Sequence, residues 1–452
     1  MIRMSLIQRW AFLLGLLLGN IYAVFAQDTD IARAQHIYEL FVAGQGDSIH
    51  GALNKELQEK LSPLVFKDIF RQSEQQFGKL QKQGDWKTQS AEGITIYYSD
   101  LTFERYSMRF LLAFDADGSL NTIRLAPVPA ASTAKAVEYD KSKMEERDIT
   151  VGAEGFKLPG TLTLPKRAVA AGKQVPCVIL VHGSGPNDRD ETVGGNKPFR
   201  DLAWGLAGKG IAVIRYDKRT KVYGLNCVPQ GRELDYDTEA VDDAVAIAAW
   251  AKSQPELAAD SVYVLGHSLG GTLAPRIAEQ SEGLAGIVIL AGLARPFEDA
   301  LVEQFTYIFS LSDSSANTKA KIAELTKQAT NVKKLGTDAF DDKIPLPLDL
   351  PRSYWLFAVN YKPVEIAAKL KLPILVLQGE RDYQVTMEDF GLWRLGLLRC
   401  KNALFKSYPK LNHLLQEGSG KSTPFEYNET SPVPGYVIDD IAAFVRGKQN
   451  TL

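Results

Sequence analysis

The segment Ser261–Gly271 reads S-V-Y-V-L-G-H-S-L-G-G, and it carries the strongest structural signal in the chain. A short apolar run, typical of a buried strand, leads in, and a helical pattern begins near Gly271. Between them, the glycines of the pattern G-x-S-x-G flank Ser268. Glycine is favoured where a sharp turn brings backbone against backbone, because a Cβ atom would clash there. The segment predicts a strand, a sharp turn and a helix with the Ser268 hydroxyl exposed; a purely structural Gly-rich turn is the alternative.

From about Glu145 onward, short apolar runs alternate with helical patterns on both sides of this segment. The runs lack polar alternation, which indicates strands buried on both faces. Such strands separated by helices predict an α/β fold, with a mostly parallel sheet covered by helices on both faces. We expect strands at Pro176–Val181, Ile211–Arg215, Val262–Leu265, Gly286–Leu290 and Ile374–Leu377, and helices at Phe199–Lys209, Asp237–Ser253 and Gly271–Gln280. Ligands of such sheets bind at the carboxyl ends of the strands.

A serine hydroxyl becomes an effective nucleophile only beside a base. The chain contains five histidines, and only His413 follows Ser268. Where G-x-S-x-G carries the nucleophile of an α/β sheet, the acid and the histidine follow it in chain order. His413 comes just after the strand-like run Ala403–Ser407, in a loop at the end of the last expected strand. We therefore predict that Ser268 is the nucleophile and His413 its base, against the alternative that His413 is a surface residue.

The third member of such a triad is a carboxylate that holds the histidine tautomer and stabilises the imidazolium. Asp382 and Glu380 both follow the expected strand Ile374–Leu377. Asp382 is favoured because the turn begins at Gly379 and the apolar Val385 closes it, and Glu380 is the local competitor.

The tetrahedral intermediate of acyl transfer needs two backbone N–H groups aimed at its oxyanion. One is expected from Leu269, directly after the nucleophile. The other is assigned to Ser184, in the loop after the strand that ends at Val181, with Gly185 as second choice. His182 is expected to buttress that loop, and the turn should direct the His267 side chain away from Ser268.

Several segments resemble the α/β-hydrolase superfamily, in its bacterial serine aminopeptidase-like and esterase-like branch. They are H-G-S-G-P-N-D-R-D (182–190), R-Y-D-K-R (215–219), G-H-S-L-G-G (266–271), G-E-R-D-Y-Q-V (379–385) and L-N-H (411–413). The resemblance covers about Glu145 to Arg446 and implies an eight-stranded, mostly parallel sheet with the triad Ser268, Asp382 and His413. Thr220 stands where related proteins usually have glycine, which puts the shape of that loop in question.

One insertion, from Pro296 to about Lys362, interrupts the alternation between the expected strands Gly286–Leu290 and Ile374–Leu377. Its helical stretches and Pro-rich patch predict a helical cap over the active site. Insertions at this point often shape a pocket, so we expect the aromatic pair Tyr354 and Trp355 to face it and contact the substrate. The competing interpretation is that both rings stabilise the cap internally.

The first 137 residues differ in pattern from the rest. Arg3, Arg9, an apolar stretch and small residues before Gln27 predict a signal peptide over residues 1–26, with an uncleaved membrane anchor as the alternative. Residues 27–137 begin with helical patterns and continue with strands, which predicts a small α+β domain ending in a Pro/Ala/Ser-rich linker. It more weakly resembles domains of unknown function that precede such hydrolases. The catalytic domain is placed at 138–447.

Composition narrows the function classes. Lys and Arg total 52 against 54 Asp and Glu, so the net charge of −2 gives no reason to expect nucleic acid as a partner. Three cysteines do not form a disulfide framework, although a Cys227–Cys400 pair stays open, and no Cys/His cluster has zinc spacing.

We therefore expect an exported, periplasmic or secreted serine hydrolase without metal or organic cofactor. Its substrate is expected to be a small acyl ester, because the cap is aromatic, with a short peptide or other amide as the alternative. After signal cleavage no integral membrane association is expected. A non-catalytic binding protein on a hydrolase scaffold is the alternative from another class, disfavoured because all three triad members are present.

Overall fold

The computed structural model describes residues 30–67, 69–91, 94–104, 107–128, 139–311 and 316–447. The chain forms two compact units that divide between Val128 and Pro129. The expected signal peptide, the expected linker after Val128 and the boundary at residue 137 lie outside the described residues.

The N-terminal unit is an α+β domain. Residues 30–42 are helical, and α2 (Gly46–Ala52), α3 (Lys55–Lys60), α4 (Pro63–Lys67) and α5 (Ile69–Phe77) follow. An antiparallel sheet comes next, with strands β1 (Leu80–Gln83), β2 (Lys87–Ala91), β3 (Ile94–Phe103), β4 (Ser107–Phe114) and β5 (Leu120–Pro127). Its order is β1-β3-β4-β5, with β2 paired to β3. Phe41 of the first helix packs on Phe110 of β4, so the helices cover one face of the sheet.

The second unit is built on an eight-stranded sheet in the order β13-β12-β11-β10-β8-β9-β7-β6. The strands are β6 (Met144–Val151), β7 (Leu158–Pro165), β8 (Val175–Val181), β9 (Ala212–Tyr216), β10 (Leu257–His267), β11 (Gly286–Leu290), β12 (Ile374–Gly379) and β13 (Ala403–Tyr408). Strands β8 to β13 run parallel, and β7 is antiparallel to both β6 and β9. The mostly parallel sheet of eight strands is confirmed.

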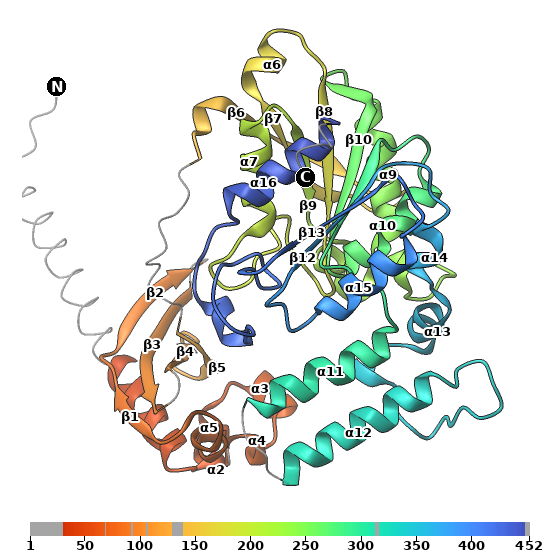
Figure 1. Cartoon of the computed structure of the whole chain (residues 1–452). Coiled ribbons are helices and arrows are strands. Elements are labelled where there is room, and N and C mark those ends of the chain that lie inside the picture. The colour runs from red at the N-terminus through yellow and green to blue at the C-terminus, as the bar shows by residue number, and fades with distance from the viewer. Residues whose placement is uncertain are drawn as a thin grey trace, which may run out of the picture. The chain divides into compact units, whose positions relative to one another are not determined.

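Two apolar cores cover the two faces of this sheet, one on each side. One contains α7 (Pro198–Gly208) and α16 (Gly435–Val445), and the other contains α9 (Asp242–Lys252), α10 (Leu269–Gln280) and α15 (Met387–Gly396) (Figure 1). Burial on both faces explains why the central strands are continuous apolar runs. The short helices α6 (Lys166–Ala170), α8 (Arg219–Tyr223) and α14 (Pro363–Ala367) complete the unit.

The insertion between β11 and β12 is helical, as expected. It contains α11 (Phe297–Ser310), α12 (Ala316–Val332), the short η4 (Pro347–Asp349) and α13 (Arg352–Asn360). Because it leaves β11 at its carboxyl end, it lies at the edge of the sheet where ligands of α/β folds bind.

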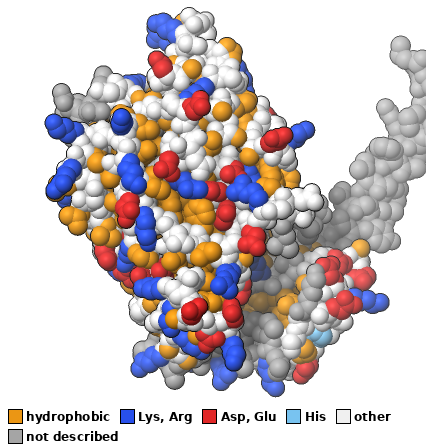
Figure 2. Space-filling model, turned by 90° about the vertical axis from the view of Figure 1, so that its right-hand side faces the viewer, with side chains coloured by type: hydrophobic (Ala, Val, Ile, Leu, Met, Phe, Trp, Pro, Cys, Tyr) orange, Lys and Arg blue, Asp and Glu red, His pale blue; other side chains and the backbone are white. Residues whose placement is uncertain are grey.

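Acidic and basic side chains are interspersed over the described residues of the face shown in Figure 2. Within the described part of the chain, no helix is long and apolar enough to span a bilayer. All three cysteines are free thiols, so the Cys227–Cys400 pair that the sequence left open is not formed.

Candidate active site

Ser268 occupies the turn between β10 and α10, at the carboxyl end of a central strand. Its backbone angles of φ 55° and ψ −118° lie where residues with a side chain are strained. A Cβ on Gly266 would lie 2.0 Å from Gly270 O, and one on Gly270 would lie 2.2 Å from Val181 O. Both glycines are therefore required sterically, and the sharp turn predicted from G-x-S-x-G is present.

Asp382 and His413 lie against each other in the loops that follow β12 and β13. His413 Nδ1 is 2.6 Å from Asp382 Oδ2, and both side chains are buried. The backbone N–H groups of Gln384 and Val385 donate to Asp382 Oδ1 at 2.8 and 3.0 Å, which fixes the carboxylate. In the neutral tautomer that donates its Nδ1 proton to Asp382, His413 has its lone pair on Nε2. Glu380, the competitor for the acid, accepts instead from Ser407 Oγ at 2.7 Å.

Contacts around Ser268 join the turn to its neighbours. A Cβ on Gly183 would lie 3.1 Å from Ser268 Cβ, so the loop after β8 passes directly beside the serine. His267 Nε2 is 2.9 Å from His413 O, and the two imidazole rings are 4.7 Å apart. The residue before the nucleophile therefore holds the loop that carries His413.

A buried Glu191–His267 pair connects the loop after β8 to the turn that carries Ser268. Glu191 Oε2 is 2.8 Å from His267 Nδ1, and Glu191 Oε1 accepts from Gly183 N at 2.6 Å. Because His413 O can only accept, His267 Nε2 carries a proton, and a second proton is shared with Glu191. Burial alone would lower the pKa of His267, but the charge and hydrogen bond of Glu191 outweigh it and raise that pKa. Burial likewise opposes ionisation of Glu191, but His267 holds the pKa of Glu191 below its ordinary value.

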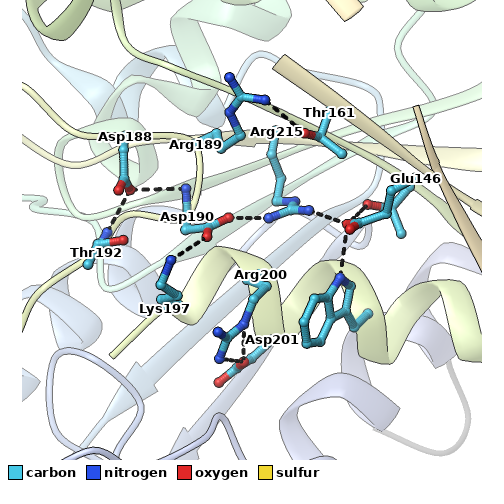
Figure 3. A network of polar contacts seen from close by, with 12 residues as sticks. Glu146, Thr161, Asp188, Arg189, Asp190, Thr192, Lys197, Arg200, Asp201 and Arg215 are labelled. Atoms are coloured by element: carbon cyan, nitrogen blue, oxygen red, sulfur yellow. Dashed lines mark hydrogen bonds and ion pairs between the residues drawn. The ribbon is translucent and has the colours of Figure 1, made fainter. Parts of the chain in front are cut away.

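Ion pairs fix the rest of the loop after β8 (Figure 3). Asp190 pairs with Arg215 and with Lys197, and Arg215 also pairs with Glu146. Arg189 pairs with Asp217 at 3.0 Å and donates to Gly160 O at 3.1 Å. Asp188 Oδ1 accepts from the N–H groups of Asp190 and Thr192 at 3.1 and 2.9 Å. The charged residues of H-G-S-G-P-N-D-R-D therefore tie the loop to the neighbouring strands.

His182 packs inside the same loop. Its ring lies 5.1 Å from that of Phe199 and 5.0 Å from that of Tyr216, and burial lowers its pKa to about 4. A histidine kept neutral among aromatic rings fits the expected buttressing role.

A cavity of about 110 Å³ opens beside Ser268. Its lining includes Ser184 and Leu269, the two residues expected to supply the oxyanion hole, together with Ser268 itself. Aromatic side chains from outside the turn complete the wall, namely Tyr236, Phe297, Tyr354 and Tyr361. The insertion thus contributes directly to the cavity that contains the predicted nucleophile.

The structure separates the expected aromatic pair. Tyr354 lines the cavity and donates its hydroxyl to Glu239 Oε2 at 2.7 Å. Trp355 does not line it: the ring is fully buried, stacks on Phe297 at 5.1 Å, and donates Nε1 to Pro347 O at 3.1 Å. Consecutive helical residues point about 100° apart, so Tyr354 can face the cavity while Trp355 turns into the core. The expectation that Trp355 faces the pocket is corrected accordingly.

Sequence reasoning did not identify Glu191, Lys218 or Glu239. Lys218 donates Nζ to Gly183 O at 2.8 Å and forms a buried ion pair with Glu239. The signal that the sequence offered for Lys218 is a charged residue shortly after an apolar strand, as in D-K-R (217–219) after β9. Among the described residues, no group of three or more His, Cys, Asp or Glu side chains is arranged to hold a metal ion.

Comparison with known proteins identifies the family. Residues 176–418 match the model described as "Serine aminopeptidase, S33", and residues 34–122 match one described as "Protein of unknown function (DUF3887)". Esterase EstD of Thermotoga maritima is 33% identical over 442 residues, which cover 97% of this chain and 99% of that protein. Both units of this chain therefore have counterparts in a single relative.

The solved structures to which the chain is similar are more distant in sequence. Est1E from Butyrivibrio proteoclasticus is 16% identical with a TM-score of 0.42, covering 67% of this chain and 99% of its own. The Pyrococcus furiosus esterase Pf2001 is 15% identical with a TM-score of 0.41, covering 70% and 96%. On the family model and the full-length relative, the chain belongs to the serine aminopeptidase S33 family of α/β-hydrolases and is a hydrolase of that type.

Proposed function

We propose that this protein hydrolyses small carboxylic esters through an acyl-enzyme formed on Ser268. The observation that carries the proposal is the buried Asp382–His413 pair at the carboxyl edge of the sheet on which the turn after β10 carries Ser268. A relative of 33% identity along nearly the whole chain is named an esterase, which supports the same reaction class.

In this mechanism Ser268 Oγ attacks the ester carbonyl carbon while His413 Nε2 removes the hydroxyl proton. Asp382 stabilises the resulting imidazolium, and the N–H groups of Leu269 and Ser184 bind the oxyanion. Collapse of the tetrahedral intermediate breaks the bond to the alcohol oxygen, which takes the proton from His413. Water then attacks the acyl-enzyme by the same route and releases the acid.

The lining of the cavity favours an ester over an aminoacyl amide. An aminopeptidase needs an acidic group to bind the substrate's free amine. Of the described residues that line the cavity, none is a carboxylate, and the charged ones are Arg295 and Lys362. Aromatic and aliphatic side chains around a cavity of about 110 Å³ suit a short, uncharged acyl group.

The experiment that tests the ester proposal compares the turnover of p-nitrophenyl esters with that of aminoacyl p-nitroanilides. The acyl chains of the esters should range from about two to about eight carbons, because an apolar pocket discriminates between chains that differ in their number of methylene groups. We expect hydrolysis of the short esters and little release of nitroaniline. Preferential cleavage of the aminoacyl anilides would contradict the ester assignment and favour an aminopeptidase.

We also propose that the chain is exported and that residues 1–26 are removed. The basic start, the apolar stretch and the small residues before Gln27 support this. Expressed in a bacterium with an intact export system, the protein should have its N-terminus at Gln27 by mass spectrometry. A protein that keeps Met1 would contradict the proposal and favour the membrane anchor.

A further inference from the structure

Gly183 is held by a charged side chain on each side. Its N–H donates to Glu191 Oε1 at 2.6 Å, and its carbonyl oxygen accepts from Lys218 Nζ at 2.8 Å. Asn187 Nδ2 also donates to this oxygen at 3.2 Å, but it carries no charge. Both peptide groups that meet at Gly183 are therefore fixed, directly beside Ser268.

Lys218 is unusual for its burial. Only 2% of its side chain is exposed, and its ion-pair partner Glu239 is 7% exposed. A buried ammonium is costly unless it is paired and hydrogen-bonded, so the ion pair and the carbonyl of Gly183 together stabilise the charge. Glu239 lies in η3 (Asp237–Val241), a turn of π-helix, which is rare and often found at functional sites.

Tyr354 completes the arrangement from the wall of the cavity. Its hydroxyl donates to Glu239 Oε2, while Lys218 occupies Oε1. Burial and the charge of Glu239 raise the pKa of Tyr354, so the hydroxyl keeps the proton that it donates. Both oxygens of Glu239 are engaged, which fixes the carboxylate and through it the ammonium group.

The geometry of the peptide bond connects Lys218 to the reaction. The carbonyl of Gly183 belongs to the same planar, trans peptide group as the N–H of Ser184, so the two point in opposite directions. A cation on the oxygen orients that N–H and also polarises the peptide, which strengthens the N–H as a donor. Ser184 lines the cavity together with Ser268.

We propose that Lys218, held by Glu239, is a positioning residue that orients and polarises the Ser184 N–H of the oxyanion hole. This inference rests on the proposed function and specifies one part of it. Lys218 contacts neither the substrate nor the reacting atoms; it acts through the peptide group between Gly183 and Ser184.

The chain offers a matched control for a purely structural role. Arg219 and Asp243 form a second buried pair between the same two segments, with 0% and 2% of their side chains exposed. Arg219 donates to Asp243 at 2.8 and 2.7 Å, and among the described residues this pair forms no hydrogen bond or ion pair with Gly183 or Ser184. Breaking either pair should destabilise the protein, whereas only the Lys218–Glu239 pair should affect the oxyanion.

The test uses the double variant Lys218→Met/Glu239→Gln, which removes the pair without leaving one buried charge. Steady-state kinetics with p-nitrophenyl acetate separate kcat from KM, and a trifluoromethyl ketone, which forms a tetrahedral oxyanion on Ser268, reports on the oxyanion hole. We expect kcat to fall roughly 10- to 100-fold, less than the loss of a donor itself, with inhibitor affinity falling in parallel and KM little changed. Arg219→Met/Asp243→Asn should lose thermal stability but keep kcat and inhibitor affinity within about threefold.

The proposal is overturned if the Lys218→Met/Glu239→Gln variant keeps both quantities within about threefold, or if the control variant loses them equally. Should the double variant be recovered unfolded, Lys218→Met alone is measured in the same way. Wild-type ester turnover that survives Ser268→Ala would instead overturn the proposed function, so the two failures are distinguishable.

Discussion

The two sides of the cavity are built on different principles. On the sheet side, the loop after β8 and the turn at Ser268 are held by buried ion pairs and backbone hydrogen bonds. On the insertion side, α11 and α13 contribute aromatic rings, such as Phe297 and Tyr354, packed around apolar neighbours. Directional contacts suit atoms that must be placed accurately for acyl transfer, whereas apolar packing can vary with the substrate. We infer that the sheet side determines the rate and the insertion side the acyl preference.

The largest effect is expected from Asp382→Asn on the sheet side. An amide no longer stabilises the His413 imidazolium and favours the wrong tautomer, so kcat for a short ester should fall about 10⁴-fold with the fold intact. The control is Glu380→Gln in the same loop, which should stay near wild type because Glu380 is exposed and bonds Ser407. Comparable losses of kcat in both variants would contradict the choice of Asp382 over Glu380.

Glu191→Gln should destabilise the protein by about 3 kcal/mol, because it leaves His267 buried without its anionic partner. Because the pKa of His267 is raised on folding, its contribution to the free energy of unfolding is complete below about pH 6.5. That contribution is lost as the pH rises through the folded-state pKa. The lowered pKa of Glu191 means that its contribution is complete above about pH 4.5 and is lost as the pH falls through the folded-state pKa.

Denaturant unfolding across this range measures the effect. The difference in unfolding free energy between wild type and Glu191→Gln should be greatest between these two pH values and should shrink on either side. A difference that does not change with pH would contradict an ionised Glu191–His267 pair.

A smaller change in activity is expected on the insertion side. There, substitutions at two nearby residues of α13 should differ in their effect, one changing protein stability and the other changing the preference for acyl chain length. Trp355→Ala should cost roughly 3–5 kcal/mol of stability while the ratio of kcat/KM between short and long acyl esters stays flat. Ala358→Phe, one turn along α13 and lining the cavity, should shift that ratio roughly 10-fold toward the short ester. A changed ratio in Trp355→Ala would contradict the purely structural role and indicate that Trp355 contacts the substrate.

Local patterns predicted the central parallel strands of the second unit, because these strands are largely buried on both faces. The strands β6 and β7 were not among those expected, and alternate residues of β6 are exposed. Strand β11 has the bounds expected from its apolar run, Gly286–Leu290. In the N-terminal unit, β1 and β2 carry no comparable signal, since L-Q-K-Q and K-T-Q-S-A have no apolar alternation.

The residues of the site show the same distinction between features that the sequence pattern predicts and features that depend on tertiary packing. Chain order placed the Asp382–His413 pair, because the fold fixes which strand ends lie together. Glu191, Lys218 and Glu239 form pairs across separate segments, and such partners follow from tertiary packing that no local pattern encodes. Trp355 was misplaced because two adjacent aromatic residues give no indication of which one faces the cavity.

The most direct test of the central claim is covalent labelling of the full-length protein with a fluorophosphonate, followed by peptide mass spectrometry. We expect one modified residue, Ser268, and neither labelling nor ester turnover in Ser268→Ala. Ser261→Ala, at the far end of the same segment, serves as the control and should label like wild type. Labelling or ester turnover that persists in Ser268→Ala would contradict the assignment of Ser268 as the nucleophile.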